Sequence, residues 1–267
     1  MIDVHCHYLP AVDDGARDIQ EAIALLRLAV KDGARQVVVT PHVYAGRWDN
    51  SLTALEPKFT AFKRLIASKR IDVELFLGAE VHLLPESLAM VERGEVPFIG
   101  GWDGQKALLL ELHDARIPPF AVNAVRHLRT LGVVPIIAHP ERNKAVMADP
   151  DCLEPFIAEG CLMQLTAASL IGRFGPQAER ASFELLERHW VHLVASDAHN
   201  LLHRPPMMKA ARKLLEKRFG EQLAAALTEQ APARLIEGRA VLGLDGDGDR
   251  QEAPARGYAA RIWSRLR

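Results

Sequence analysis

The stretch "VPIIAHPER" (residues 134–142) is an apolar run that ends abruptly in polar residues. Continuous apolar runs are typical of parallel strands that are covered on both faces. Similar runs recur along the 267-residue chain, and they predict strands at residues 2–5, 36–40, 73–80, 107–111, 134–139, 162–166 and 191–196. The chain is therefore predicted to contain a mainly parallel sheet.

The segments between these runs have the spacing of amphipathic helices. In residues 18–33 the apolar positions recur on one helical face, and the segment ends at a glycine. Comparable patterns lie near residues 53–68, 119–131, 178–189 and 207–227. Strands alternating with helices predict an α/β fold with helical crossovers.

Metal-binding residue types stand at the ends of six of the seven predicted strands. They are His5 and His7, His42, Glu80, Glu111, His139, and Asp197 with His199. The strand at 162–166 ends without one, although Gln164 and Thr166 can support ligands from behind. The carboxyl ends of parallel strands converge on one mouth in a barrel, whereas the outer strands of an open sheet end too far apart. The pattern therefore favours a β/α barrel.

These strand ends predict a metal centre. His5 and His7 lie two residues apart, as do Asp197 and His199, so each pair projects from one face of an extended chain. Either Asp13 or Asp14 can add a carboxylate, and Asp14 is favoured. The nine predicted ligands are His5, His7, Asp14, His42, Glu80, Glu111, His139, Asp197 and His199. Nine ligands with bridging carboxylates can serve two or three ions, and mixed imidazole and carboxylate donors suit Mn, with Fe, Zn or Mg as substitutes.

The composition excludes several classes of function. The net charge of −1 provides no bulk attraction to nucleic acid or to an anionic membrane. No apolar run approaches the roughly 18 residues of a membrane span. The first residues also lack the basic segment followed by an apolar one that is typical of a signal peptide. We therefore expect no nucleic-acid partner and no membrane insertion.

The three cysteines, Cys6, Cys152 and Cys161, are too few for a disulfide framework and fit a reducing cytoplasm. None is followed six residues later by arginine, which excludes a phosphatase of the Cys-x5-Arg type. Residues 1–240 are predicted to form the catalytic domain, and residues 241–267 a linker and an arginine-bearing tail.

Six motifs, taken in order and spacing, resemble a known family. They are "MIDVHCHYLPAVDDG", "TPH", "GAE", "LLLE", "AHPER" and "SDAHN". They resemble the polymerase-and-histidinol-phosphatase (PHP) superfamily, and within it the manganese-dependent protein-tyrosine phosphatases of capsule and exopolysaccharide gene clusters. The resemblance covers residues 1 to about 240. It implies a distorted seven-stranded parallel β/α barrel with three metal ions on the nine ligands, and a phosphate contact from Arg142.

The implied substrate is phosphotyrosine on the C-terminal tail of a membrane-bound bacterial tyrosine autokinase. His42 or His199 is a candidate proton donor to the leaving group. Many relatives carry a further histidine after "TPH", where this chain reads "VYAGRWDN". Arg47 of this stretch is either a phosphate contact or a loop charge. His82, two residues after Glu80, either supports a ligand or lies in a surface loop, and the surface loop is favoured.

Two alternative functions remain open at this point. The first is a PHP phosphatase or phosphodiesterase that acts on a small molecule, such as a sugar phosphate, histidinol phosphate or a nucleotide. The second is a scaffold that binds a kinase without turnover, although a degenerate scaffold is expected to lose ligands, and this chain keeps all nine.

Overall fold

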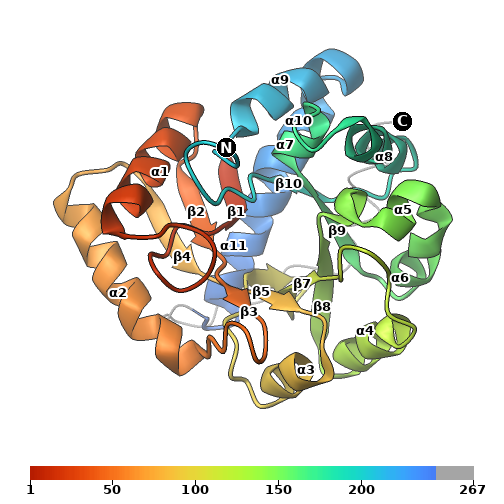
Figure 1. Cartoon of the computed structure of the whole chain (residues 1–267), viewed down its shortest axis with the longest axis horizontal. Helices are drawn as coiled ribbons and strands as arrows, with labels where there is room; N and C mark the ends of the chain where they lie inside the picture. The colour runs from red at the N-terminus through yellow and green to blue at the C-terminus, as the bar shows by residue number, and fades with distance from the viewer. Residues whose placement is uncertain (245–267) are drawn as a thin grey trace.

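Parallel strands surrounded by helices form the molecule, as Figure 1 shows for the computed structural model, which describes residues 1–244. The parallel strands are β1 (Ile2–Cys6), β2 (Gln36–Val39), β3 (His42–Val43), β4 (Glu74–Leu77), β5 (Glu80–His82), β7 (Gln105–Glu111), β8 (Val133–Ala138), β9 (Leu162–Thr166) and β10 (Leu193–Ala195). The short strand β6 (Gly100–Trp102) pairs antiparallel with β7.

Two barrel strands are broken in the middle. Strand β2 pairs with β1 and with β4 in a sheet of order β1-β2-β4. The continuations of β2 and β4, which are β3 and β5, join a sheet of order β10-β9-β8-β7-β5-β3. Residues 73–80 were predicted as one strand, but Gly78 separates β4 from β5. A Cβ on Gly78 would lie 2.7 Å from Ile99 Cγ2, so the close approach at this break requires glycine.

The two sheets meet where the first strand lies beside the last. His7 N donates to Ala198 O at 2.9 Å, and Asp197 N donates to His5 O at 2.8 Å. Counting each broken strand once, seven parallel strands of the described chain close a distorted barrel. The predicted fold is confirmed, and the strand breaks are an addition to it.

Most of the helices surround the strands, and the last helix lies behind them in the view of Figure 1. The helices are α1 (Ile19–Asp32), α2 (Leu52–Ser68), α3 (Pro85–Glu92), α4 (Ala121–Thr130), α5 (Lys144–Ala148), α6 (Glu154–Ala158), α7 (Ala167–Leu170), α8 (Pro176–Glu187), α9 (Met208–Phe219), α10 (Glu221–Ala225) and α11 (Ala231–Val241). Short 3-10 turns span Pro140–Arg142 and Pro150–Leu153, and a π-turn spans Ala226–Gln230. The helix predicted at 207–227 is divided because Gly220, with φ of 90°, ends α9.

Alternate strand residues pack inside and outside the barrel. Leu109 and Ile136 belong to the interior cluster, whereas Leu108 and Leu110 pack outward with Val125 of α4. Helix α11 packs against β6 and adds apolar side chains to the interior cluster. The apolar interior therefore forms a floor beneath the carboxyl ends of the strands.

Within residues 1–244, none of the helices combines the length and the apolar character that a membrane crossing requires. The predicted linker and tail at 241–267 lies almost entirely outside the described residues.

Candidate metal centre

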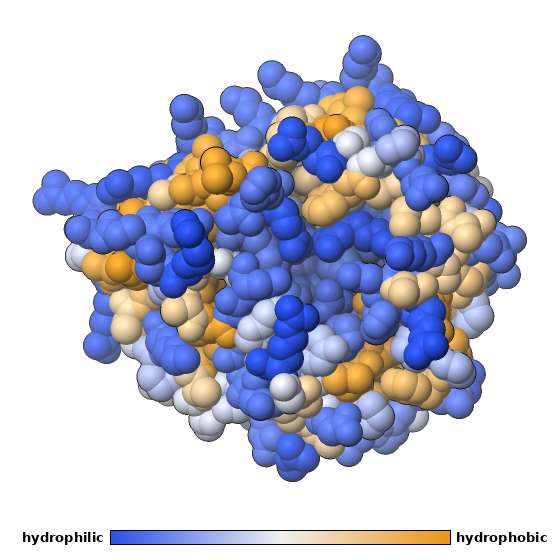
Figure 2. All heavy atoms as spheres, viewed as in Figure 1, coloured by the Kyte–Doolittle hydropathy of each residue, from blue (hydrophilic) through white to orange (hydrophobic). Residues whose placement is uncertain are grey.

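A hydrophilic hollow opens near the centre of the face seen in Figure 2. At the carboxyl ends of the strands, polar side chains line a cavity of about 240 Å³. Its lining includes Asp14, His42, Glu80, Glu111, His139, Arg142 and Arg204. The mouth predicted from the strand ends is therefore present.

Eight of the nine predicted ligands form three groups whose ligand atoms lie within 4.8 Å of one another. The groups are His7, Asp14, His42 and His199; His5, His7, Glu80 and Asp197; and His42, Glu80 and Glu111. The ninth residue, His139, adjoins them, because its Nε2 lies 2.8 Å from Glu80 Oε1 and 3.8 Å from Glu111 Oε1. All nine residues are thus gathered at one mouth.

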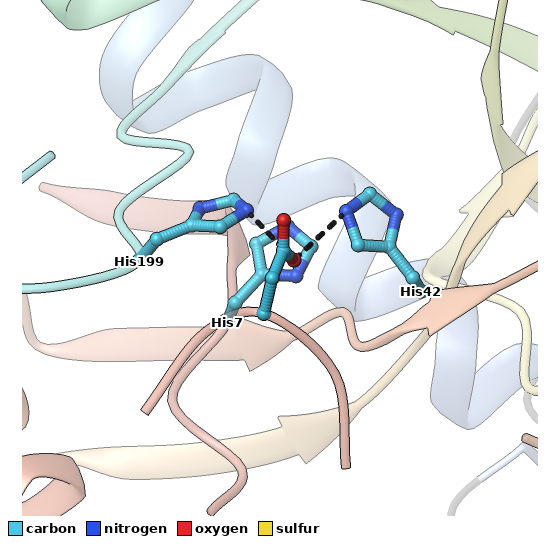
Figure 3. Close-up of side chains that lie close together, drawn as sticks. His7, His42 and His199 are labelled. Carbon is cyan, nitrogen blue, oxygen red and sulfur yellow. Dashed lines mark ion pairs between the residues drawn. The ribbon is translucent and has the colours of Figure 1, made fainter. Parts of the chain in front are cut away.

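The first of these groups is drawn in Figure 3, where the imidazoles of His42 and His199 face one carboxylate from two sides. That carboxylate is Asp14, whose Oδ1 lies 3.4 Å from His42 Nε2 and 3.5 Å from His199 Nε2. Asp14 itself comes from the loop after β1, and His42 begins β3. Three segments distant in sequence therefore converge on one carboxylate oxygen.

Several atoms of the candidate ligands are buried without a hydrogen-bond partner. They are His42 Nδ1, Glu80 Oε2, Asp197 Oδ1 and His199 Nε2. Buried polar atoms without a partner are costly, and native proteins satisfy nearly all of them. In addition, the Nε2 atoms of His5 and His7 lie only 3.3 Å apart. The donor set therefore fits divalent cations, which would satisfy these atoms together.

The electrostatics of the centre also favour cations. Burial acts to lower the pKa of His5, but the Glu80 and Asp197 carboxylates outweigh it and raise the pKa. Burial acts in the opposite sense on Glu80, and the surrounding histidines, His5 foremost, hold its pKa well below the usual range. For His199 burial dominates and lowers the pKa to about 4, so its ring is neutral at pH 7 and able to ligate metal.

Hydrogen bonds orient two of the ligand imidazoles. His5 Nδ1 lies 2.7 Å from Gln164 Oε1, and His7 Nδ1 lies 2.8 Å from Asp13 Oδ2. In both rings Nε2 is left to face the other ligands, which is the usual arrangement behind metal-binding histidines. Gln164 comes from β9, the strand without a ligand at its end, and has the supporting position predicted for it.

Asp13 and Asp14 differ in their surroundings. Asp13 Oδ2 accepts the backbone N–H of His42 at 2.9 Å as well as facing His7, and Asp13 Oδ1 accepts Gly15 N at 3.0 Å. Both Asp13 oxygens are therefore engaged, whereas Asp14 faces two histidine nitrogens directly. This geometry supports Asp14 as the ligand and Asp13 as the residue that orients His7.

Two arginines share one carboxylate oxygen of the candidate ligand Asp197. Arg142 Nη1 and Arg204 Nη2 both donate to Asp197 Oδ2, the second of these at 2.5 Å. Burial acts to raise the pKa of Asp197, but Arg204, His5 and Arg142 hold it well below its usual range. The other oxygen, Asp197 Oδ1, faces His5 and His7 at 3.3 and 3.6 Å. Asp197 therefore joins the arginines to the candidate ligands.

Arg204 was not among the predicted site residues. It reaches the centre because Asn200 Oδ1 accepts the backbone N–H groups of Leu202, His203 and Arg204, and this turns the loop back. The signal in the sequence is the asparagine followed, five residues later, by two prolines, a pattern typical of a tight turn.

His82 also differs from its prediction. It is buried rather than placed in a surface loop, and its Nδ1 lies 2.9 Å from Glu111 Oε2. Its position two residues after Glu80 on a strand puts both side chains on one face, which is the spacing behind the alternative prediction that His82 supports a ligand. His82 orients Glu111 as Asp13 orients His7.

A family model described as "Capsular polysaccharide synthesis, CpsB/CapC" matches residues 1–237. The chain belongs to the CpsB/CapC family. Among CpsB/CapC relatives, the tyrosine-protein phosphatase YwqE of Bacillus subtilis is 34% identical over 231 residues, covering 86% of this chain and 90% of the relative. The tyrosine-protein phosphatase CpsB of Streptococcus pneumoniae is 30% identical over 243 residues, covering 88% of this chain and 98% of the relative.

A solved structure extends the CpsB/CapC comparison to three dimensions. It comes from work on YwqE of Bacillus subtilis and CpsB of Streptococcus pneumoniae, described as unique metal-dependent tyrosine phosphatases. It matches with a TM-score of 0.78 at 31% identity, and the match covers 96% of this chain and 100% of the solved one. The overall fold of this chain is therefore that of the solved CpsB/CapC relative.

Proposed function

We propose that this protein is a metal-dependent phosphomonoester hydrolase that removes phosphate from phosphotyrosine in a protein. The observation that carries the proposal is the cluster of unpartnered ligand atoms beside two arginines at one cavity. The curated relatives named above are tyrosine-protein phosphatases, which supports phosphotyrosine as the substrate.

The nine residues predicted as ligands would hold two or three divalent ions. When bound, such ions supply a hydroxide nucleophile at neutral pH and neutralise the charge of the phosphoryl group. The mixture of histidine and carboxylate donors, without a thiolate, supports Mn as the metal, with Fe, Zn or Mg as substitutes. Gln164, Asp13 and His82 keep their partner ligands in position.

Arg142 and Arg204 bind and orient the phosphoryl group in this mechanism. Both line the cavity, and each uses one nitrogen to contact Asp197. Because a guanidinium has five N–H donors in a planar fork, donors remain for phosphoryl oxygens. The Phe174 ring lies 4.5 Å from the Arg142 guanidinium carbon and 5.9 Å from that of Arg204, and this packing restrains both arginines.

The leaving group needs little protonation, because a phenol has a pKa of about 10. His42 and His199 are the two candidates for the proton donor. His42 lines the cavity, whereas His199 is 2% exposed and is absent from the lining. These positions support His42 over His199 as the proton donor, a role open to His42 only where its ring does not ligate a metal ion.

Membership of the CpsB/CapC family also supports a biological setting for the reaction. We propose that the substrate is the tyrosine-phosphorylated C-terminal tail of a membrane-bound tyrosine autokinase. Dephosphorylation of this tail in the cytoplasm would then regulate capsular or exopolysaccharide synthesis.

The test compares substrates and metals in one assay. The protein is stripped of metal and then assayed on a phosphotyrosine peptide and on a sugar phosphate, with Mn added back. We expect Mn-dependent turnover of the peptide, lost in His139→Ala and retained in His127→Ala, a control that alters an exposed histidine of α4. Turnover of the sugar phosphate alone would contradict the protein substrate, and no turnover with any divalent ion would contradict the hydrolase.

A further inference from the structure

A tight turn after β3 carries three side chains into the cavity wall. Tyr44 N donates to Trp48 O at 3.0 Å, and Trp48 N donates to Tyr44 O at 2.8 Å. Asp49 Oδ1 accepts Gly46 N at 2.7 Å and closes the turn from the side. Tyr44, Arg47 and Trp48 all line the cavity. The turn is therefore a built part of the mouth.

The rings of this turn stack on histidines of the centre. Trp48 lies against His42, with ring centres 4.9 Å apart and an angle of 8° between the planes. Tyr44 lies against His82, with ring centres 4.2 Å apart and an angle of 4°. Two parallel stacks therefore fix the turn relative to the metal-ligand residues.

The Arg47 guanidinium is held by aromatic rings and by no carboxylate of the described residues. Its Cζ lies 4.0 Å from the Trp48 ring centre and 5.9 Å from that of Tyr44, within the range of cation–π attraction. Arg47 is exposed, and across residues 1–244 it forms neither an ion pair nor a side-chain hydrogen bond. Its five N–H donors are consequently available to an anion from outside.

The position of Arg47 differs from that of the other two cavity arginines. Arg142 and Arg204 contact the ligand carboxylate of Asp197, whereas Arg47 contacts Trp48, which in turn contacts His42. The guanidinium is thus one aromatic ring farther from the ligand residues than the arginines that suit the phosphoryl group. The Arg47 guanidinium carbon lies 4.0 Å from the Trp48 ring centre, which lies 4.9 Å from the His42 ring centre. An extended peptide, at about 3.3 Å per residue, covers these two distances together in two to three residues.

We propose that Arg47 binds an acidic side chain of the substrate peptide, a few residues from the phosphotyrosine. The proposal rests on the proposed function, because it names the peptide that the same cavity accepts. A carboxylate is the side chain that matches a planar guanidinium in two hydrogen bonds. Arg47 thereby selects acidic sequences around the phosphotyrosine, while Arg142 and Arg204 serve the phosphoryl group.

The experiment uses the full-length, Mn-loaded protein and three substrates. These are a phosphotyrosine peptide with glutamates at the second and third positions on each side, the same peptide with glutamines there, and phenyl phosphate. Arg47→Gln is compared with the wild type, with Arg47→Lys as the variant that keeps the charge, and with Arg116→Gln as a control at another exposed arginine.

In the wild type we expect a lower KM for the glutamate peptide than for the glutamine peptide, and a difference that shrinks as salt is added. Arg47→Gln should reduce this selectivity three- to tenfold through KM, Arg47→Lys should restore part of it, and Arg116→Gln should preserve it. Equal losses on all three substrates would overturn the proposal in favour of a phosphate contact, and unchanged selectivity would reduce Arg47 to a loop charge. A wild type inactive on every phosphotyrosine substrate would instead contradict the proposed function.

Discussion

Replacing Asp197 with asparagine removes one charge from a carboxylate that serves two purposes. Its side chain is completely buried, with Oδ2 accepting from Arg142 and Arg204 and Oδ1 facing His5 and His7. Asparagine has nearly the same shape, but it offers one acceptor oxygen and an N–H₂ group. It cannot accept from the arginines and present an anionic oxygen to the histidines at the same time.

The size of the effect follows from the two ion pairs. Two unit charges about 4 Å apart at an effective dielectric constant of about 20 attract by roughly 4 kcal/mol. The desolvation of the buried carboxylate offsets much of the attraction of two such pairs. Breaking a buried pair by removing one partner costs about 3–5 kcal/mol, because the other charges stay buried without compensation. We expect Asp197→Asn to lower the free energy of unfolding of the metal-free protein by this amount.

Urea denaturation in the presence of a chelator measures this loss without any contribution from metal. Activity on a phosphotyrosine peptide at saturating Mn should fall by about a hundredfold or more, as for other groups that stabilise transition-state charge. Asp114→Asn is the control, since Asp114 lines the same cavity but is exposed and forms no ion pair with a described residue. A loss of unfolding free energy below about 1 kcal/mol would refute the assignment of Asp197 as the shared partner of both arginines.

Three further outcomes are expected. Asp13→Asn should weaken Mn binding by about 10- to 100-fold through His7, a smaller effect than that of Asp14→Asn, and calorimetric titration of Mn would reveal the order. Burial lowers the pKa of His192 to about 4, below the value of about 6.5 in the unfolded chain. The contribution of the neutral ring to stability is therefore lost as the pH falls through that interval. From pH 7 to pH 5 the free energy of unfolding of the wild type, measured in urea, should fall by about 2 kcal/mol more than that of His192→Asn. A Cβ on Gly238 would lie 2.4 Å from Gly101 O, so Gly238→Ala should cost about 1–3 kcal/mol in the same assay, unlike Glu237→Ala on the exposed side of α11.

The barrel and its ligand set could be predicted because each strand shows a plain signal. Each apolar run is long enough to indicate a strand, and the polar residue that follows it lies at the mouth of the barrel, as His139 does after β8. The geometry of parallel strands then brings these ends together without further information. The nine candidate ligands were predicted in this way and by resemblance, and the structure gathers them at one mouth.

What escaped prediction depends on contacts between segments distant in sequence. The break between β4 and β5 arises where Gly78 meets Ile99, and no local pattern indicates that meeting. Arg204 reaches the centre because Asn200 turns its loop back. For His82 the spacing left a supporting role and a surface loop open, and its burial beside Glu111 decides between them. In each case the tertiary neighbour, rather than the local sequence, determines the role.

The contact between the first and last strands has a consequence for the life of the protein in the cell. Between β1 and the segment that follows β10 the pairing is short, with Cys6 and Ala198 forming an isolated bridge. Yet His5 and His7 on one side and Asp197 on the other belong to one group of candidate ligands. A bound ion would fasten the two ends of the barrel across this join and stabilise the folded chain by mass action. We therefore expect metal starvation to shorten the lifetime of the protein against proteases, so that metal supply sets its abundance as well as its turnover rate.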